Sequence, residues 1–295
     1  MSLLESVADR TVGRVETKTN LGPDAQVDNK NLIITPQRPE LTDPFLALVE
    51  DWFSEPGFDW HPHRGLETVT LVVDGVLEHG DNVGNAGALT TGDVQWMTAG
   101  RGIIHRELAF RNERAHTLQL WLNLPASLKM TERRYQDLLA DQRPVAEQDG
   151  VRVDVISGTA AGVTGPAANH WPISAAVITL EPNQTYRHVL PGRDRAFAYV
   201  LAGRVTIAGR AVAEGQIAWS DPVGQAGTDS ALRLETGDGD APSKLLIYSG
   251  EPIRQPVAVG GPFVMNTKDQ IELAFKDFQS GKFGEVPRMA RLRYR

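Results

Sequence analysis

Four residues at two short spacings carry the chemistry that this sequence could perform. His61 and His63 are separated by one residue, and so are His105 and Glu107. In an extended chain, side chains two positions apart point to the same side of the strand, so each pair can aim at one point. Three imidazole nitrogens and one carboxylate oxygen suit a first-row divalent metal such as iron(II), manganese, nickel, copper or zinc. Such a set leaves coordination positions open for water, dioxygen or substrate.

A histidine pair also has an explanation without a metal. A lone His-x-His in a strand is more often exposed to solvent, or hydrogen-bonded within the core, than bound to a metal. The second pair at His105 and Glu107, later in the chain, favours the metal site. His79 is the nearest other histidine, and we expect it to have a structural role or to lie at the rim of the pocket.

Strand signals surround both pairs. Residues 68–73 (TVTLVV) are rich in β-branched side chains and lead into Asp74-Gly75, a dipeptide typical of a hairpin turn. A return strand is therefore expected over 76–79.

A second strand is expected over residues 117–123 (TLQLWLN), where apolar and other side chains alternate. The three leucines then share one face, while Gln119, Trp121 and Asn123 share the other. Gln119 is a candidate for the wall of the metal pocket, and an ordinary solvated strand position is the equal alternative.

The strand pattern breaks after Leu124-Pro125. Residues 131–142 are expected to form a short helix, and strand patterns resume at residue 151. Near the C-terminus, Thr267 and Gln270 fit a capping box, followed by apolar residues at helical spacing. A helix is therefore expected at about 267–280.

A faint internal repeat joins the two halves of the chain. Residues 92–96 (GDVQW) and 215–219 (GQIAW) share a Gly-x-x-x-Trp pattern, each after a strand-like segment that ends in glycine. Two copies of one β unit predict a two-domain β protein. The second copy has no histidine between Gly203 and Glu235, so we expect a scaffold or cover domain without a metal site of this kind.

Composition narrows the classes of function. The chain has 295 residues, 30 basic and 37 acidic, with a net charge of −7, which argues against direct binding of nucleic acid. It has no cysteine, which excludes disulfide scaffolds, thiolate zinc sites and cysteine nucleophiles. No apolar run approaches the roughly 18–20 residues that span a bilayer, and the N-terminus lacks the pattern of a secretory signal. A cytoplasmic protein without membrane contact is expected.

Six segments together resemble the pirin family of the cupin superfamily. They are HPHRGLETVT (61–70), LEHGD (77–81), GDVQWMTAGRGIIHRE (92–107), WLNLP (121–125), YQ (135–136) and GPFVMNT (261–267). The resemblance implies an all-β bicupin of two stacked antiparallel β-barrels of the jelly-roll type, with a short C-terminal helix. The expected parts are a metal-binding barrel over 1–130, a connector over 131–150 and a metal-free barrel over 151–295.

The family pattern implies a single metal per chain, usually iron(II), with manganese, nickel, copper, cobalt and zinc as alternatives. Its implied ligands are His61, His63, His105 and Glu107. Many other cupins instead take the carboxylate from the position of Glu67, which has the same parity as the first histidine pair.

Four residues remain as candidates for the surroundings of the metal. Glu67, Arg64, His79 and Gln119 are expected to orient a ligand or to line the pocket. Arg64 also has the commoner interpretation of a salt-bridged arginine.

The resemblance implies a dioxygenase that cleaves quercetin or a related flavonol with dioxygen. Glu107 is then both a ligand and the candidate base that removes a substrate hydroxyl proton. The alternative is a metal-bearing, redox-responsive regulatory protein that binds protein partners.

Overall fold

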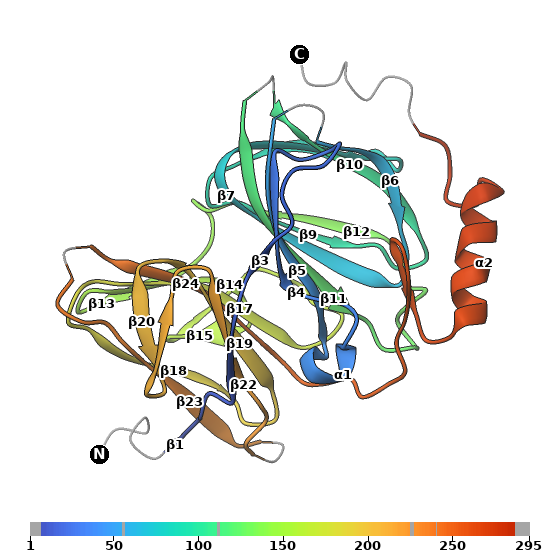
Figure 1. Cartoon of the computed structure of the whole chain (residues 1–295). Helices are drawn as coiled ribbons and strands as arrows, with labels where there is room; N and C mark the ends of the chain where they lie inside the picture. Colours follow the sequence, from blue (N-terminus) through green and yellow to red (C-terminus); the bar gives the residue numbers. More distant parts are fainter. Residues whose placement is uncertain (1–6, 55–56, 111–112, 225–226, 240, 287–295) are drawn as a thin grey trace. The chain divides into compact units, whose positions relative to one another are not determined.

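Strands make up most of the computed structural model drawn in Figure 1. The structure describes residues 7–54, 57–110, 113–224, 227–239 and 241–286. Contacts divide the chain into two units, each built from two separate stretches. The first unit comprises Thr19–Asp141 and Ile253–Arg295, and the second comprises Met1–Lys18 and Gln142–Pro252. Within the described ranges, no helix is long and apolar enough to cross a membrane.

The first unit holds both helices. Its elements are β3 (Thr19–Asn20), β4 (Asn29–Ile34), α1 (Pro39–Thr42), β5 (Phe45–Phe53), β6 (Phe58–His63), β7 (Leu66–Asp81), β8 (Ala86–Thr90), β9 (Val94–Thr98), β10 (Ile103–Ala109), β11 (Ala115–Asn123), β12 (Arg134–Leu138), β25 (Ala258–Gly260), β26 (Phe263–Met265) and α2 (Lys268–Gln279).

The second unit is built of strands alone in its described part. Its elements are β1 (Ala8–Asp9), β2 (Arg14–Thr17), β13 (Val145–Gln148), β14 (Val151–Ser157), β15 (Thr159–Ala160), β16 (Val163–Thr164), β17 (Ile173–Leu180), β18 (Thr185–Pro191), β19 (Arg195–Ala202), β20 (Arg204–Ile207), β21 (Arg210–Ala213), β22 (Gln216–Ser220), β23 (Asp229–Glu235) and β24 (Ser243–Gly250).

The large sheets of the two units share one strand order. It is β12-β9-β7-β11-β5-β4 in the first unit and β2-β22-β19-β24-β17-β14 in the second. The two Gly-x-x-x-Trp segments lead into the equivalent strands β9 and β22, where Trp96 lies opposite Val69 and Trp219 opposite Phe197. Both indoles are buried. The shared order supports the predicted repeat, with β2 at the edge position that β12 holds in the first unit.

The all-β prediction with a short C-terminal helix is confirmed. The pairing is more open than the predicted barrels, because in the described residues of neither unit do the sheets close into a ring. Among the described residues, the named strands pair antiparallel, apart from the parallel pair of β1 and β23.

The strand β7 runs unbroken through the predicted hairpin turn at Asp74-Gly75, so that prediction is wrong. Gly75 has a φ of +85°, and a Cβ there would clash with the carbonyl oxygen of Arg114. The register with β11 shifts beside this position. The dipeptide is therefore a bulge at which the strand bends. The first part of β7 pairs with β9 and β11, and the second part with β8 and β10.

Residues 131–142 form no helix, contrary to the prediction; they contain the strand β12, which pairs antiparallel with β9. Tyr135 packs against the buried side chains of Met97, Ala99 and Ile103. Burial of this ring on the sheet outweighs the weak local preference for a helix.

The helix α2 confirms the predicted capping box, since the Thr267 side chain accepts a hydrogen bond from the Gln270 amide. Ile271 and Ala274 are buried in a cluster that includes Ile104 of β10. These contacts place the helix in the first unit, whereas the sequence-based boundaries assign it to the C-terminal domain. The last stretch of the chain thus belongs with the strands that carry the histidine pairs.

Two buried cations, Lys129 and Arg64, bind the C-terminal stretch that holds β26 and α2. The Lys129 ammonium donates to the carbonyl oxygens of Gly65, at 2.8 Å, and Val264, at 3.1 Å. The Arg64 guanidinium lies 2.9 Å from the Asp277 carboxylate of α2. Both contacts anchor residues that adjoin the His61–His63 segment.

Candidate metal centre

The two histidine pairs meet on neighbouring strands of the first unit. β6 and β10 run antiparallel, with His61 opposite His105 and His63 opposite Ile103; the two strands are labelled together in Figure 1. The imidazole centroids of His61 and His105 are 4.3 Å apart, and His63 lies 5.0 and 5.1 Å from them. One nitrogen from each ring lies within 4.8 Å of the others. This is a three-histidine group that could hold a metal ion.

The hydrogen bonds of these rings leave nitrogens available for a metal. His61 Nδ1 contacts the Asp59 carbonyl at 2.7 Å, and His63 Nδ1 contacts the Pro262 carbonyl at 3.1 Å. His63 Nε2 and both ring nitrogens of His105 are buried without a hydrogen-bond partner in the described part of the chain. Buried polar atoms are rarely left unpaired, so the donor set fits a metal that would satisfy them.

Burial keeps the imidazoles of His63 and His105 neutral. It lowers the pKa of His63 to about 3, and the neighbouring His61 adds to the effect. Burial also holds the pKa of His105 well below its usual value. A metal binds the neutral imidazole, so at neutral pH both rings are in the form that coordinates.

Glu107 lies two residues beyond His105, after a shift in the β6–β10 register. Its carboxylate is buried and accepts hydrogen bonds from Thr70 Oγ1 at 3.1 Å and from Gln119 Nε2 at 2.8 Å. The compact group of three ligand nitrogens does not include it. Its role as the fourth ligand therefore stays a prediction.

Gln119 connects Glu107 with an aromatic side chain beside the histidines. Its Oε1 accepts a hydrogen bond from Trp121 Nε1 at 3.1 Å, and the Trp121 ring lies edge-on to His63 at 5.2 Å. The leucines on the other face of β11 are buried, as the alternation predicts. The sequence analysis did not identify Thr70 as a partner of Glu107. Thr70 lies opposite Gln119 in the β7–β11 pair, and this pairing follows from the fold and not from a local sequence pattern.

Glu67 lies away from this network. Side chains alternate along β7, so Glu67 is on the face opposite to Thr70, where it accepts a hydrogen bond from Thr98 at 2.6 Å. Burial raises its pKa. The expectation that Glu67 orients a metal ligand finds no support in these contacts.

Arg64 also makes its contacts away from the histidine cluster. Besides the Asp277 carboxylate it contacts the Arg101 carbonyl at 2.7 Å and lies over the Phe283 ring. Arg64 is thus a salt-bridged arginine, the second of the two interpretations that the sequence allows. None of these contacts is with a histidine of the candidate site.

His79 lies opposite Glu107 across the β7–β10 pair, and opposite residues share a face of the sheet. Its Nε2 is 3.2 Å from a carboxylate oxygen of Asp137, and its ring stacks on Tyr135. His79 is therefore on the side of the sheet that bears Glu107, held by its own acidic partner. Sequence reasoning did not identify Asp137, which is distant along the chain.

The second unit has leucines at two of the three positions that correspond to the histidine cluster. β18 precedes β19 as β6 precedes β7, and His188 lies opposite Leu232 as His61 lies opposite His105. Two positions further along β18 is Leu190, at the place of the second histidine of the first pair. His188 is therefore the one histidine among these three positions, and Leu190 and Leu232 stand at the other two.

Comparisons with known proteins give matches in both halves of the chain. The model of the family described as Pirin matches residues 33–122, and that of the Pirin C-terminal cupin domain matches residues 175–284. Human pirin is 40% identical over 253 residues, which cover 84% of this chain and 86% of the human protein.

Solved structures share the fold. A quercetin 2,3-dioxygenase from Acinetobacter baumannii has a TM-score of 0.83 and 30% identity, with 95% of this chain and 100% of that chain covered. The bacterial pirin YhhW from Escherichia coli, solved in complex with nickel(II), has a TM-score of 0.64 and 22% identity, with 81% and 99% covered. The YhhW likeness shows the fold alone.

Proposed function

The chain belongs to the pirin family, and from this premise we propose that it is a metal-dependent dioxygenase that cleaves a flavonol such as quercetin. The observation that carries the proposal is the cluster of His61, His63 and His105. Buried ring nitrogens of His63 and His105 have no hydrogen-bond partner among the described residues. The similarity to a quercetin 2,3-dioxygenase over nearly the whole chain supports the reaction class.

We propose that the three histidines and Glu107 hold one divalent metal, iron(II) in the first instance. Manganese, nickel, copper, cobalt and zinc accept the same nitrogen and oxygen donors. When bound, such a metal supplies Lewis-acid polarisation of a substrate hydroxyl and an open position for dioxygen.

Glu107 is the proposed acceptor of the proton from the flavonol hydroxyl. A carboxylate has about four lone-pair sites, and two are occupied by the hydrogen bonds from Thr70 and Gln119. These two donors fix the carboxylate while the remaining sites stay available. The half-buried Trp121, edge-on to His63, adds an aromatic surface that suits a planar substrate.

The test measures oxygen uptake, quercetin loss and carbon monoxide release by the metal-loaded protein. Ring cleavage between two oxygenated carbons expels the carbon between them, so the three quantities should change in step. His63→Ala should abolish the reaction, because one nitrogen donor is lost. The matched control is His188→Leu, which removes a buried histidine of the second unit and should leave the rate unchanged.

A metal-loaded protein that takes up no oxygen with any flavonol would overturn the proposal. The metal-bearing regulatory protein would then be the better account, because it requires the same ligands and no turnover.

A further inference from the structure

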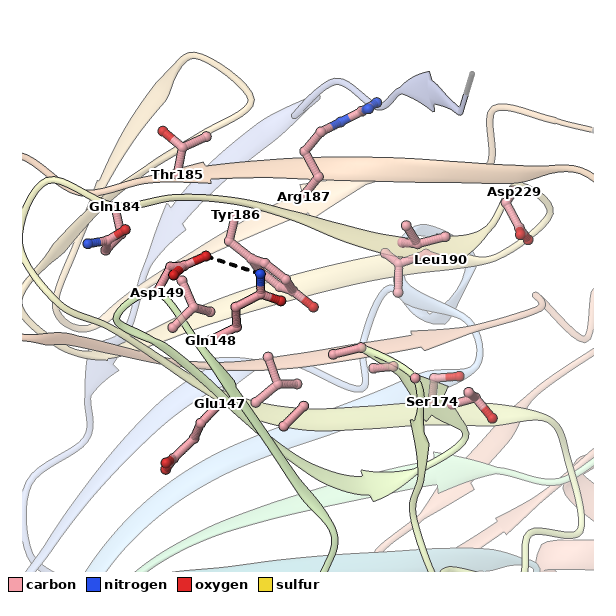
Figure 2. Close-up of a pocket in the computed structure, with 18 of the residues that line it drawn as sticks. Glu147, Gln148, Asp149, Ser174, Gln184, Thr185, Tyr186, Arg187, Leu190 and Asp229 are labelled. Atoms are coloured by element: carbon pink, nitrogen blue, oxygen red, sulfur yellow. Dashed lines mark hydrogen bonds between the residues drawn. The ribbon is translucent and has the colours of Figure 1, made fainter. Parts of the chain in front are cut away.

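The second unit contains a cavity that the proposed reaction does not use. Its volume is about 980 Å³, at the upper end of the roughly 300–1,000 Å³ typical of small-molecule pockets. Residues from β13, β14, β15 and β17 line one side, and residues from β18 with Asp229 line the other. Figure 2 shows these side chains facing one another across the hollow.

The interior of this cavity is apolar. Val151, Val153 and Leu190 line it, and all three also belong to the buried core of the unit. The Tyr186 ring extends into the same space in Figure 2 and packs on that core. A ligand with an apolar body would therefore continue the hydrophobic core of the unit.

Two hydroxyl groups face the cavity without a protein partner. The hydroxyls of Tyr186 and Ser174 form no hydrogen bond within the described residues, although both side chains line the pocket. Burial raises the pKa of Tyr186 to about 12, so its hydroxyl keeps its proton and can donate as well as accept. These groups offer a ligand two directed hydrogen bonds.

The charges around the cavity are mainly acidic. Among the described residues, Arg187 is the one cationic side chain that lines the cavity. Its guanidinium lies 2.7 Å from the Asp9 carboxylate. Glu147 is paired with Arg152, but Asp149 at one end and Asp229 at the other have no cationic partner in the structure's described part. Figure 2 shows these two carboxylates at opposite ends of the pocket. The field therefore disfavours an anion.

We propose that this cavity binds an uncharged or cationic small molecule that has an apolar ring body and hydroxyl or amino donors. The site lies in the unit that lacks the histidine cluster, and the inference does not depend on the flavonol reaction. An apolar interior, two unpartnered hydroxyls and an acidic rim together define this ligand class.

Three probes with one ring system test the proposal by titration calorimetry on the full chain. They are 2-naphthylmethanol, 2-naphthylmethylammonium and 2-naphthoate. The alcohol and the ammonium should bind, and the carboxylate should bind about ten-fold more weakly or worse because of the acidic rim.

A cavity-filling variant locates the binding. Ala160→Trp places an indole at a half-buried lining position and should weaken binding of the alcohol about ten-fold or more. Ala211→Trp is the matched control, an exposed position of the same unit on β21 outside the cavity, and should bind like the wild type. Metal content and oxygen uptake should be the same in all three proteins.

A third variant covers the case in which Ala160→Trp does not fold. Tyr186→Phe keeps the ring and removes the hydroxyl, and it should weaken binding of the alcohol about three-fold or more. The proposal is overturned by absence of binding for the alcohol and the ammonium, by equal binding of the carboxylate, or by wild-type affinity in a folded Ala160→Trp protein. It is also overturned by wild-type affinity in Tyr186→Phe.

Discussion

Replacement of Gln119 by leucine tests the network behind the proposed carboxylate ligand. The Gln119 amide donates to Glu107 at 2.8 Å and to Thr70 at 3.0 Å, and it accepts from Trp121. Gln119→Leu keeps a similar volume and removes all three hydrogen bonds. Glu107 is 2% exposed, and among the described residues its carboxylate then keeps only the hydrogen bond from Thr70.

The expected loss of metal affinity follows from the charge of the Glu107 carboxylate, which accepts the hydrogen bond that Gln119 donates. A hydrogen bond to a charged group contributes about 1.5–3 kcal/mol. Loss of a partner that orients a metal ligand typically lowers metal affinity about 10–100-fold, which corresponds to about 1.4–2.8 kcal/mol. The two ranges agree, so Gln119→Leu should raise the metal Kd by about 10–100-fold.

The assay is titration of metal-free protein with iron(II) under anaerobic conditions, in competition with a chelator. The matched control is Gln216→Leu, because Gln216 of β22 also makes side-chain hydrogen bonds but lies in the second unit. The control should keep wild-type affinity. A Gln119→Leu protein that folds normally and binds iron(II) like the control would refute the reasoning, because Gln119 would then not orient a ligand.

Three further tests have distinct expected results. In metal titrations, Glu107→Gln should weaken binding about ten-fold or more and Glu67→Gln should not; the reverse order would assign the carboxylate ligand to Glu67. Burial lowers the pKa of His188 to about 4, so between pH 6.5 and 4 the unfolded chain takes up a proton that the folded chain excludes. The free energy of unfolding should fall by about 3 kcal/mol as the pH falls through this window. His188→Leu should remove this component in urea titrations at several pH values, and an unchanged pH profile would contradict it. Arg64→Ala should lower the free energy of unfolding by about 1.5 kcal/mol, because the Asp277 carboxylate loses its guanidinium partner but keeps its ion pair with Lys282; an unchanged urea midpoint would show that the Arg64–Asp277 ion pair does not hold α2.

Local patterns were enough to predict much of this fold and the histidine cluster. The alternation over residues 117–123 places Gln119 and the leucines on their observed faces, because one face of β11 is buried. The His-x-His spacing brings both rings to one side for the same reason. These features depend on residues close together in the sequence.

Other features depend on contacts that sequence patterns do not carry. Asp74-Gly75 gives the same signal for a hairpin and for a bulge, and only the approach of Arg114 shows that it is a bulge. Residues 134–138 become a strand because β9 offers an edge. The partner of Arg64 is Asp277, at the far end of the chain, so nothing near Arg64 could indicate that contact.

Metal content per chain tests the central claim most directly. Protein purified after loading with iron(II) and removal of excess metal should contain one ion per chain, as measured by elemental analysis. His105→Ala should lose nearly all of this metal, because His105 contributes a fully buried imidazole to the three-histidine group, whereas His188→Leu should keep it. Full occupancy in a folded His105→Ala protein, or two ions per wild-type chain, would contradict the account.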